Sequence, residues 1–108
     1  MPEPADLRMT TIPLHHGAGR MPALGFGTLI PDPAETITAT RDALKAGFRH
    51  FDCAERYRNE REVGTALQAG LAAGGLARAD IFVTTKIFDR DRVSATVREG
   101  RLRVCGEL

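Results

Sequence analysis

The sequence predicts an α/β protein built from consecutive strand and helix units. Three apolar segments of strand length, at residues 23–28, 48–53 and 81–83, are separated by two segments with helical spacing, at residues 34–46 and 60–73. This alternation is typical of right-handed βαβ units, in which parallel strands form one sheet and the helices pack against it. No internal repeat or low-complexity tract interrupts the pattern.

Length and composition are those of one globular domain. The chain has 108 residues, of which 43% are hydrophobic and 27% charged, a balance that is not typical of disordered or membrane proteins. A closed eight-stranded α/β barrel normally needs ~250 residues. We therefore expect one ordinary domain but not a complete barrel.

The charge pattern and the cysteines limit the possible partners and compartments. The net charge is +1 with both signs interspersed, so we expect neither a nucleic acid nor an anionic membrane as partner. No apolar run reaches the ~20 residues of a membrane span, and the first twenty residues lack a signal-peptide core. Cys53 and Cys105 are too few for a disulfide scaffold or a zinc site. These observations favour a cytoplasmic location.

The amino-terminal part predicts a leader and a hairpin. Residues 1–10 are polar and mixed, so we expect a loose leader, followed by one domain over residues 11–108. Residues 11–14 and 20–24 flank a short segment with two glycines, which permit positive φ. This arrangement predicts a short hairpin.

The first strand and helix follow directly. Residues 23–28 predict a short strand whose glycines allow another backbone or a ligand to come close, and two prolines then end it. From Ala34 the spacing becomes helical, with Ile37 and Leu44 two turns apart. Gly47 provides a carboxyl-terminal cap for this helix.

Two further units are expected. Residues 48–53 predict a second strand, and Asn59 is suited to cap a second helix in which apolar residues recur every four positions over residues 63–71. Residues 81–83 are continuously apolar, as in a parallel strand covered on both faces. A third helix is expected to begin near Asp91.

Three polar side chains fall at the edge where α/β folds assemble active sites. Asp52 ends the second predicted strand, and Lys86 follows the end of the third. Neighbouring parallel strands lie ~4.8 Å apart, so these two side chains can form a semi-buried ion pair at one rim of the sheet. Tyr57, in the loop after Asp52, can reach that pair.

This combination suits the reduction of a carbonyl group. A phenol has an ordinary pKa of ~10, which makes it a slow acid at neutral pH unless a nearby ammonium stabilises the phenolate. A carboxylate can fix that ammonium in place. Tyr57 could then protonate the alkoxide that forms when hydride reaches a carbonyl carbon. The residues therefore predict reduction of aldehydes or ketones.

Three motifs in order resemble one known family. Residues 47–60 read GFRHFDCAERYRNE and resemble the aldo-keto reductase signature G-[FY]-R-H-[IF]-D-x-A-x-x-Y-x-N-E, which Val63-Gly64 continues. Residues 21–28 resemble the first barrel strand of that family, and residues 80–86 resemble the strand that delivers its lysine. The resemblance covers roughly residues 11–98.

The resemblance implies a fold and a set of catalytic residues. The implied fold is a partial (β/α)8 TIM barrel of the aldo-keto reductase type, with an amino-terminal hairpin and three βα units. Asp52, Tyr57 and Lys86 match three members of the family's catalytic tetrad. The fourth member is a histidine on the next strand, which would lie beyond Leu108.

The resemblance also implies a cofactor, NADPH or NADH. The rim expected on its nicotinamide side consists of Gly27, Thr28, Leu29 and Asp52. Leu29 occupies a position where many relatives carry a tryptophan. The loops that hold the cofactor phosphates lie late in the family's barrel, so we expect the 108-residue chain to bind cofactor weakly or not at all.

Two functions follow from this resemblance. The first is an NAD(P)H-dependent oxidoreductase that reduces a small carbonyl substrate to an alcohol, here truncated before the catalytic histidine and the phosphate site. The second is a non-catalytic barrel remnant or interaction fragment. Open strand edges would let such a fragment associate with itself.

The same residues have other interpretations when considered singly. An Asp52–Lys86 pair is more often structural than catalytic, and an isolated Tyr57 is more often an amphipathic surface residue. His15 and His16 have no third ligand nearby, so a metal site is not expected. The combined motifs favour the catalytic interpretation for Asp52, Tyr57 and Lys86.

Other oxidoreductase and nucleophile motifs are not met. Gly25 and Gly27 begin a dinucleotide fingerprint, but Ile30 replaces its third glycine. Arg61 occupies the position where short-chain dehydrogenases carry lysine after their tyrosine. Cys53 has no base beside it, so we expect a small buried residue and not a nucleophile.

Overall fold

The computed structural model describes residues 4–87. Within that range no helix is both long and apolar enough to cross a membrane. Three short 3₁₀ turns, η1 (His15–Gly17), η2 (Glu55–Tyr57) and η3 (Arg78–Asp80), accompany the main elements. The helices and strands, in chain order, are α1 (Pro4–Met9), β1 (Thr11–Pro13), β2 (Arg20–Pro22), β3 (Phe26–Gly27), α2 (Pro33–Ala46), β4 (His50–Asp52), α3 (Glu60–Gly74) and β5 (Phe82–Thr84).

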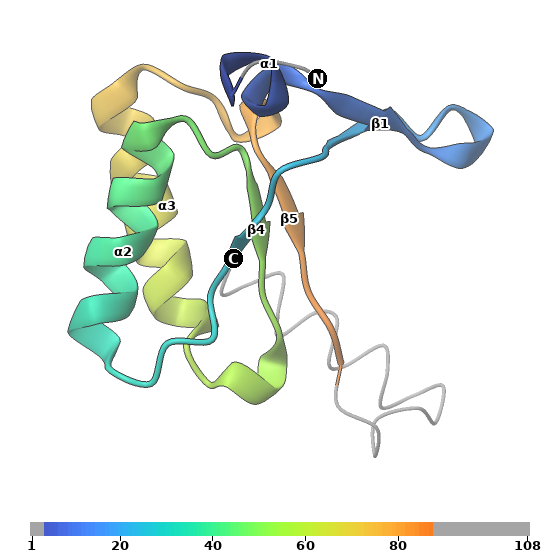
Figure 1. The fold of residues 1–108 in the computed structure, drawn as a ribbon. Coiled ribbons are helices and arrows are strands. Elements are labelled where there is room, and N and C mark those ends of the chain that lie inside the picture. The colour runs from blue at the N-terminus through green and yellow to red at the C-terminus, as the bar shows by residue number, and fades with distance from the viewer. Residues whose placement is uncertain (1–3, 88–108) are drawn as a thin grey trace.

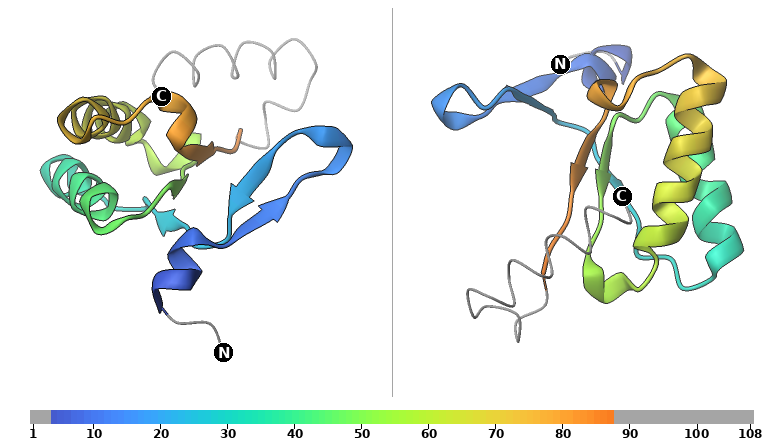
Figure 2. Two further views of the ribbon diagram at one scale, coloured as in Figure 1. Left: turned by 90° about the horizontal axis from the view of Figure 1, so that it is seen from above. Right: turned by 180° about the vertical axis from the view of Figure 1, so that it is seen from behind.

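A parallel three-stranded sheet with two helices on one face forms the body of the chain. The strand order is β3-β4-β5, and Asp52 pairs in register with Gly27 on one side and Thr84 on the other. Helices α2 and α3 lie side by side on the same face of this sheet (Figures 1 and 2). The α/β fold class is confirmed, whereas the third helix expected near Asp91 lies outside the described residues.

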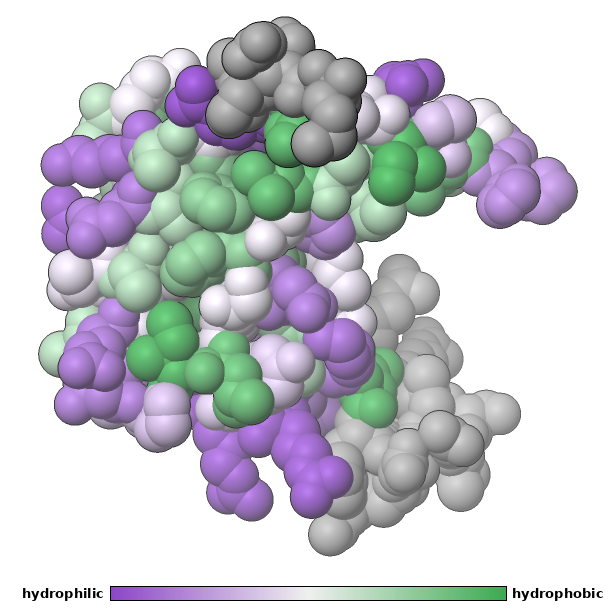
Figure 3. Space-filling model, in the orientation of Figure 1, coloured by the Kyte–Doolittle hydropathy of each residue, from purple (hydrophilic) through white to green (hydrophobic). Residues whose placement is uncertain are grey.

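The hairpin expected near the amino terminus is present. Strands β1 and β2 are antiparallel, with Thr11 opposite Pro22, and η1 forms the turn between them. The hairpin projects away from the sheet as an arm (Figure 2), and apolar surface is visible along this arm in the space-filling view (Figure 3). Ile12 is one of its exposed apolar residues.

Part of the stretch expected to be a loose leader is helical. The structure places α1 at Pro4–Met9. The Arg8 guanidinium donates to the carbonyl oxygen of Ala46 at 3.2 Å, where α2 ends. This bond between distant parts of the chain holds the short helix against the body, and a local sequence pattern could not reveal it.

Both ends of α2 have clear local causes. The Asp32 carboxylate accepts the backbone N–H of Glu35 at 3.0 Å and so caps the first turn, and Pro33 fits this turn because its missing N–H is not needed there. Gly47, with φ of 109°, ends the helix in a left-handed conformation, as predicted. The capping role of Asp32 was not among the sequence predictions.

The hydrophobic core lies between the two helices and one face of the sheet. The third strand was expected to be covered on both faces, but β5 is only half-buried because the described helices cover a single face. Gly70 lets α2 and α3 approach closely, since a Cβ there would lie 2.7 Å from Cδ2 of Leu44. The buried members of the core are Ala43, Leu44, Phe51, Cys53, Val63, Leu67, Leu71 and Ile81.

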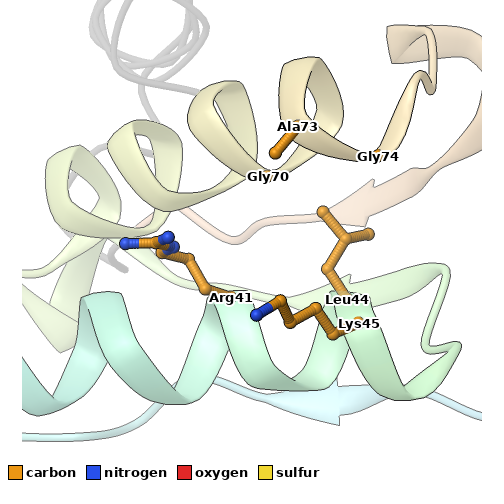
Figure 4. Close-up of a pocket in the computed structure, with 6 residues that line it drawn as sticks. All are labelled: Arg41, Leu44, Lys45, Gly70, Ala73 and Gly74. Carbon is orange, nitrogen blue, oxygen red and sulfur yellow. The ribbon is translucent and has the colours of Figure 1, made fainter.

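A small cavity opens between α2 and α3. Its volume is about 120 Å³, which is below the ~300 Å³ of small ligand pockets. None of the predicted site residues lines it, so it is not the candidate site. The lining residues, shown in Figure 4, are Arg41, Leu44, Lys45, Gly70, Ala73 and Gly74.

Candidate active site

The predicted ion pair is present at the carboxyl ends of β4 and β5. Lys86 Nζ lies 2.7 Å from Oδ1 of Asp52 and also donates to the carbonyl oxygen of Cys53 at 3.0 Å. The parallel register of the two strands brings the side chains together, because Asp52 pairs with Thr84 and Lys86 follows two residues later. The ammonium is therefore held by two acceptors from one neighbouring strand end.

Tyr57 completes a three-residue cluster. Its phenol oxygen lies 3.4 Å from Lys86 Nζ, and the ring centroid lies 5.2 Å from the same atom. The Glu55 N–H donates to the Lys86 carbonyl oxygen at 3.1 Å and so fastens η2 to the end of β5. Arg58, with φ of 56°, turns the chain just after Tyr57. The loop thus directs the phenol toward the ion pair.

The electrostatics keep Lys86 charged. Partial burial works to lower the pKa of Lys86, but the hydrogen bonds to Asp52 and Tyr57 raise it by more, so the pKa lies above its ordinary value of 10.5. The side chains of Lys86 and Asp52 are 49% and 43% exposed. They are more open than the semi-buried pair expected, because no described element covers this side of the sheet. The cluster is therefore a charged group open to solvent.

The expected nicotinamide rim divides into a buried and an open part. Thr28 is fully buried, and its N–H and hydroxyl both donate to the Asp52 carbonyl oxygen, at 3.1 and 2.8 Å. Leu29 is 67% exposed, and a Cβ on Gly27 would meet nothing within 4 Å. Thr28 therefore supports the backbone of Asp52, whereas Gly27 and Leu29 form the accessible surface of the rim.

Asn59 supports this rim from the start of α3. It occupies the position before the helix, but its side chain makes no capping bond, contrary to the expected capping role. Its amide nitrogen instead donates to the carbonyl oxygens of Thr28 at 2.5 Å and Ile30 at 3.2 Å. The prediction that the Asn59 side chain caps α3 was wrong. The bonds from Nδ2 to the two carbonyl groups orient the amide, and its Oδ1, the atom that a cap would use, makes no hydrogen bond within the described residues.

Glu60, the next residue, contacts the segment that directly follows β5. Its side chain is buried and accepts a hydrogen bond from the hydroxyl of Thr85. Thr85 immediately precedes Lys86 along the chain. No role for Glu60 was predicted from the sequence, where its one distinguishing feature is its place as the last residue of the matched signature.

His50, in β4, is bonded to residues of β2 and β5. Its Nδ1 lies 3.1 Å from the Pro22 carbonyl oxygen, which can only accept, so Nδ1 carries the proton. Its Nε2 lies 2.7 Å from the hydroxyl of Thr84 and can accept from it. Both ring nitrogens are thus used in structural bonds.

Cys53 is buried and poorly suited to act as a nucleophile. Its side chain is fully buried, and this burial raises the pKa of the thiol from its ordinary value of 9.0 to about 11, despite the lowering effect of a hydrogen bond with Thr28. A thiol with this pKa stays protonated at neutral pH. The expectation of a small packed residue agrees with this position.

The raised pKa of Cys53 predicts a specific loss of stability in alkali. Below pH 9 the thiol is protonated in both states, whereas between pH 9.0 and about 11 only the unfolded chain releases the proton. The free energy of unfolding should therefore fall across this window, by at most about 1.4 kcal/mol per pH unit from this group. Urea unfolding of Cys105→Ser and of Cys53→Ala/Cys105→Ser over this pH range measures the difference. Equal slopes for the two variants would contradict the assignment.

The three-residue cluster has the parts needed for acid–base chemistry on a polar substrate. The phenol of Tyr57 can give up a proton, the ammonium of Lys86 can stabilise the oxygen left behind, and the carboxylate of Asp52 holds the ammonium. Gly27, in register with Asp52, leaves open space beside this cluster. A flat ring or a small carbonyl compound could lie there.

The chain is similar in sequence to known proteins. A family model described as Aldo/keto reductase family matches residues 23–107. "Aldo-keto reductase family 1 member A1-A" of Danio rerio is 43% identical over 91% of this chain and 30% of its own length. "Aldo-keto reductase family 1 member C23" of Equus caballus is 46% identical over 61% of this chain and 21% of its own length.

A solved structure has the same arrangement of elements. The aldose reductase from Schistosoma japonicum superposes with a TM-score of 0.87 at 36% identity, over 93% of this chain and 33% of that chain. The chain thus spans a third or less of the length of these three proteins. The described residues correspond to part of a barrel of this type, without closure. By its sequence match and its fold, the chain belongs to the aldo/keto reductase family of oxidoreductases.

Proposed function

We propose that this chain supplies the proton-donating part of a carbonyl reductase that uses NADPH or NADH. The observation that carries the proposal is the position of Lys86 Nζ, 2.7 Å from Asp52 Oδ1 and 3.4 Å from the Tyr57 hydroxyl. A phenol beside an ammonium is a group that can protonate an alkoxide at neutral pH.

Each residue has one task in this proposal. When bound, the cofactor supplies hydride to the carbonyl carbon of an aldehyde or ketone. The Tyr57 hydroxyl then gives its proton to the carbonyl oxygen, so that one hydride and one proton together produce the alcohol. Lys86 stabilises the phenolate, and Asp52 together with the Cys53 carbonyl holds Lys86 in place.

The described rim fits one end of the cofactor. Gly27 leaves open space, and Leu29 offers an exposed apolar side chain for a flat ring beside Asp52. The buried hydroxyl of Thr28 is bonded to the backbone and is not offered to a ligand. Within residues 4–87, this rim therefore suits the nicotinamide group. We propose that residues outside this range hold the cofactor phosphates.

A hybrid barrel tests the proposal. Residues 1–86 are joined to the part of the Danio rerio relative that follows its matching lysine, and NADPH consumption is measured with an aromatic aldehyde. We expect turnover comparable to that of the relative, with NADPH and aldehyde consumed in equal amounts. A hybrid that unfolds on heating as cooperatively as the relative but shows no turnover would contradict the proposal.

A second proposal concerns the association state of the 108-residue polypeptide by itself. Within the described part, β3 and β5 each have one paired neighbour, and apolar side chains such as Leu24 are exposed. Such edges and surfaces favour association of chains. We propose self-association and expect sedimentation to show dimers or larger species at micromolar concentration. A single monomeric species across the concentration range would contradict this.

A further inference from the structure

Glu60 is a buried carboxylate that lies near the proposed acid–base cluster, because it is bonded to the residue that precedes Lys86. It is 3% exposed and is the first residue of α3. Burial of a carboxylate is costly unless hydrogen bonds compensate for the lost water. The hydroxyl of Thr85 supplies one such bond from the end of β5. The contact therefore joins α3 to the segment that carries Lys86.

The geometry around this contact fixes the segment from two sides. The carbonyl oxygens of Thr84 and Lys86 accept the N–H groups of Cys53 and Glu55, at 2.7 and 3.1 Å. These bonds attach the backbone on the side of β4, and the bond between Thr85 and Glu60 adds a side-chain attachment to α3. Side chains alternate along an extended segment, so a bond at Thr85 on the helix side sets the direction of Lys86 on the other side.

We infer that Glu60 is a positioning residue for Lys86: through the Thr85 hydroxyl it fixes the strand end so that Nζ reaches both Asp52 and Tyr57. The inference concerns the geometry of the cluster, and its consequence for turnover rests on the proposed function. A purely structural alternative exists, because a carboxylate in the first turn of a helix also interacts favourably with the helix dipole. Under that alternative the Thr85 hydroxyl would not matter for Lys86.

The variant Thr85→Val separates the two explanations. It removes the hydroxyl but keeps the shape of an exposed residue, so the fold should persist where Glu60→Ala could unfold α3. Thr85→Ser keeps the hydroxyl and is the matched control. The readout is the titration of the lysine Nζ resonances in the 108-residue chain labelled with ¹⁵N-lysine. The sequence has two lysines, so Lys45 on α2 serves as the internal reference.

We expect Thr85→Val to lower the pKa of Lys86 toward its ordinary value, because the ammonium moves away from Asp52, and Thr85→Ser to keep it raised. The Lys45 resonance should be the same in all three proteins. In the hybrid barrel, Thr85→Val should reduce turnover by up to ~10²-fold, the scale for a catalytic group misplaced by about 1 Å, whereas Thr85→Ser should keep near-normal turnover.

The outcomes distinguish this inference from the proposed function. A shifted Lys86 titration in Thr85→Val, together with a hybrid barrel that is inactive in every form, would support the positioning role and count against carbonyl reduction. An unchanged Lys86 titration in Thr85→Val would overturn the positioning role, whatever the turnover of the hybrid.

Discussion

In the hybrid barrel, Tyr57→Phe should lower turnover by ~10²-fold or more, the usual scale for loss of one acid–base group. The change removes only the hydroxyl, which lies 3.4 Å from Lys86 Nζ. The ring remains, so packing and cofactor affinity should be preserved. Without the phenol, the remaining proton donor among the cluster's three side chains is the Lys86 ammonium, which Asp52 holds and whose raised pKa makes it a weaker acid.

The control for Tyr57→Phe is Cys53→Ala, which changes a neighbouring side chain that has no role in the proposed chemistry and keeps the backbone carbonyl that accepts from Lys86. We expect nearly normal turnover for this variant. Steady-state reduction of one aldehyde at saturating NADPH, with the cofactor dissociation constant measured separately, gives the comparison. Near-normal turnover in Tyr57→Phe would mean that the proton donor has been misassigned.

Lys86→Met should lower turnover by a similar ~10²-fold, because it removes the ammonium that stabilises the phenolate. Methionine keeps much of the length and apolar stem of lysine. Asp52 loses its partner, but its side chain is 43% exposed and can be hydrated, so we expect little loss of stability.

Lys45→Met is the matched control for this variant, since it removes the other lysine of the chain from the exposed side of α2. Turnover should be unchanged by it. Equal turnover for Lys86→Met and Lys45→Met would show that the ammonium beside Tyr57 has no part in proton transfer.

The parts of the site that local patterns determine could be predicted from the sequence. Strand ends follow from apolar runs, and parallel register then places Asp52 and Lys86 at one edge, where the ion pair is found. Gly47 ends α2 as expected because a left-handed residue is required there. The first strand is shorter than expected: β3 covers only Phe26–Gly27, since pairing with β4 is limited to these two residues.

The supporting bonds could not be predicted in the same way. Asn59 reaches Thr28 and Ile30, which are 31 and 29 residues away, and Glu60 reaches Thr85, which is 25 residues away. Such contacts depend on how the loops lie over the strand ends. An asparagine before a helix locally favours capping, so only the three-dimensional arrangement shows that its amide is used elsewhere.

The central claim is that Tyr57 and Lys86 act as one acid–base unit, and the double variant tests it most directly. Turnover of the hybrid barrel is measured for Tyr57→Phe, Lys86→Met and both together. Groups that act as a unit give strongly non-additive losses. We expect the double variant to be no slower than the slower single variant, within a few-fold. A double variant whose loss equals the product of the two single losses would contradict the claim.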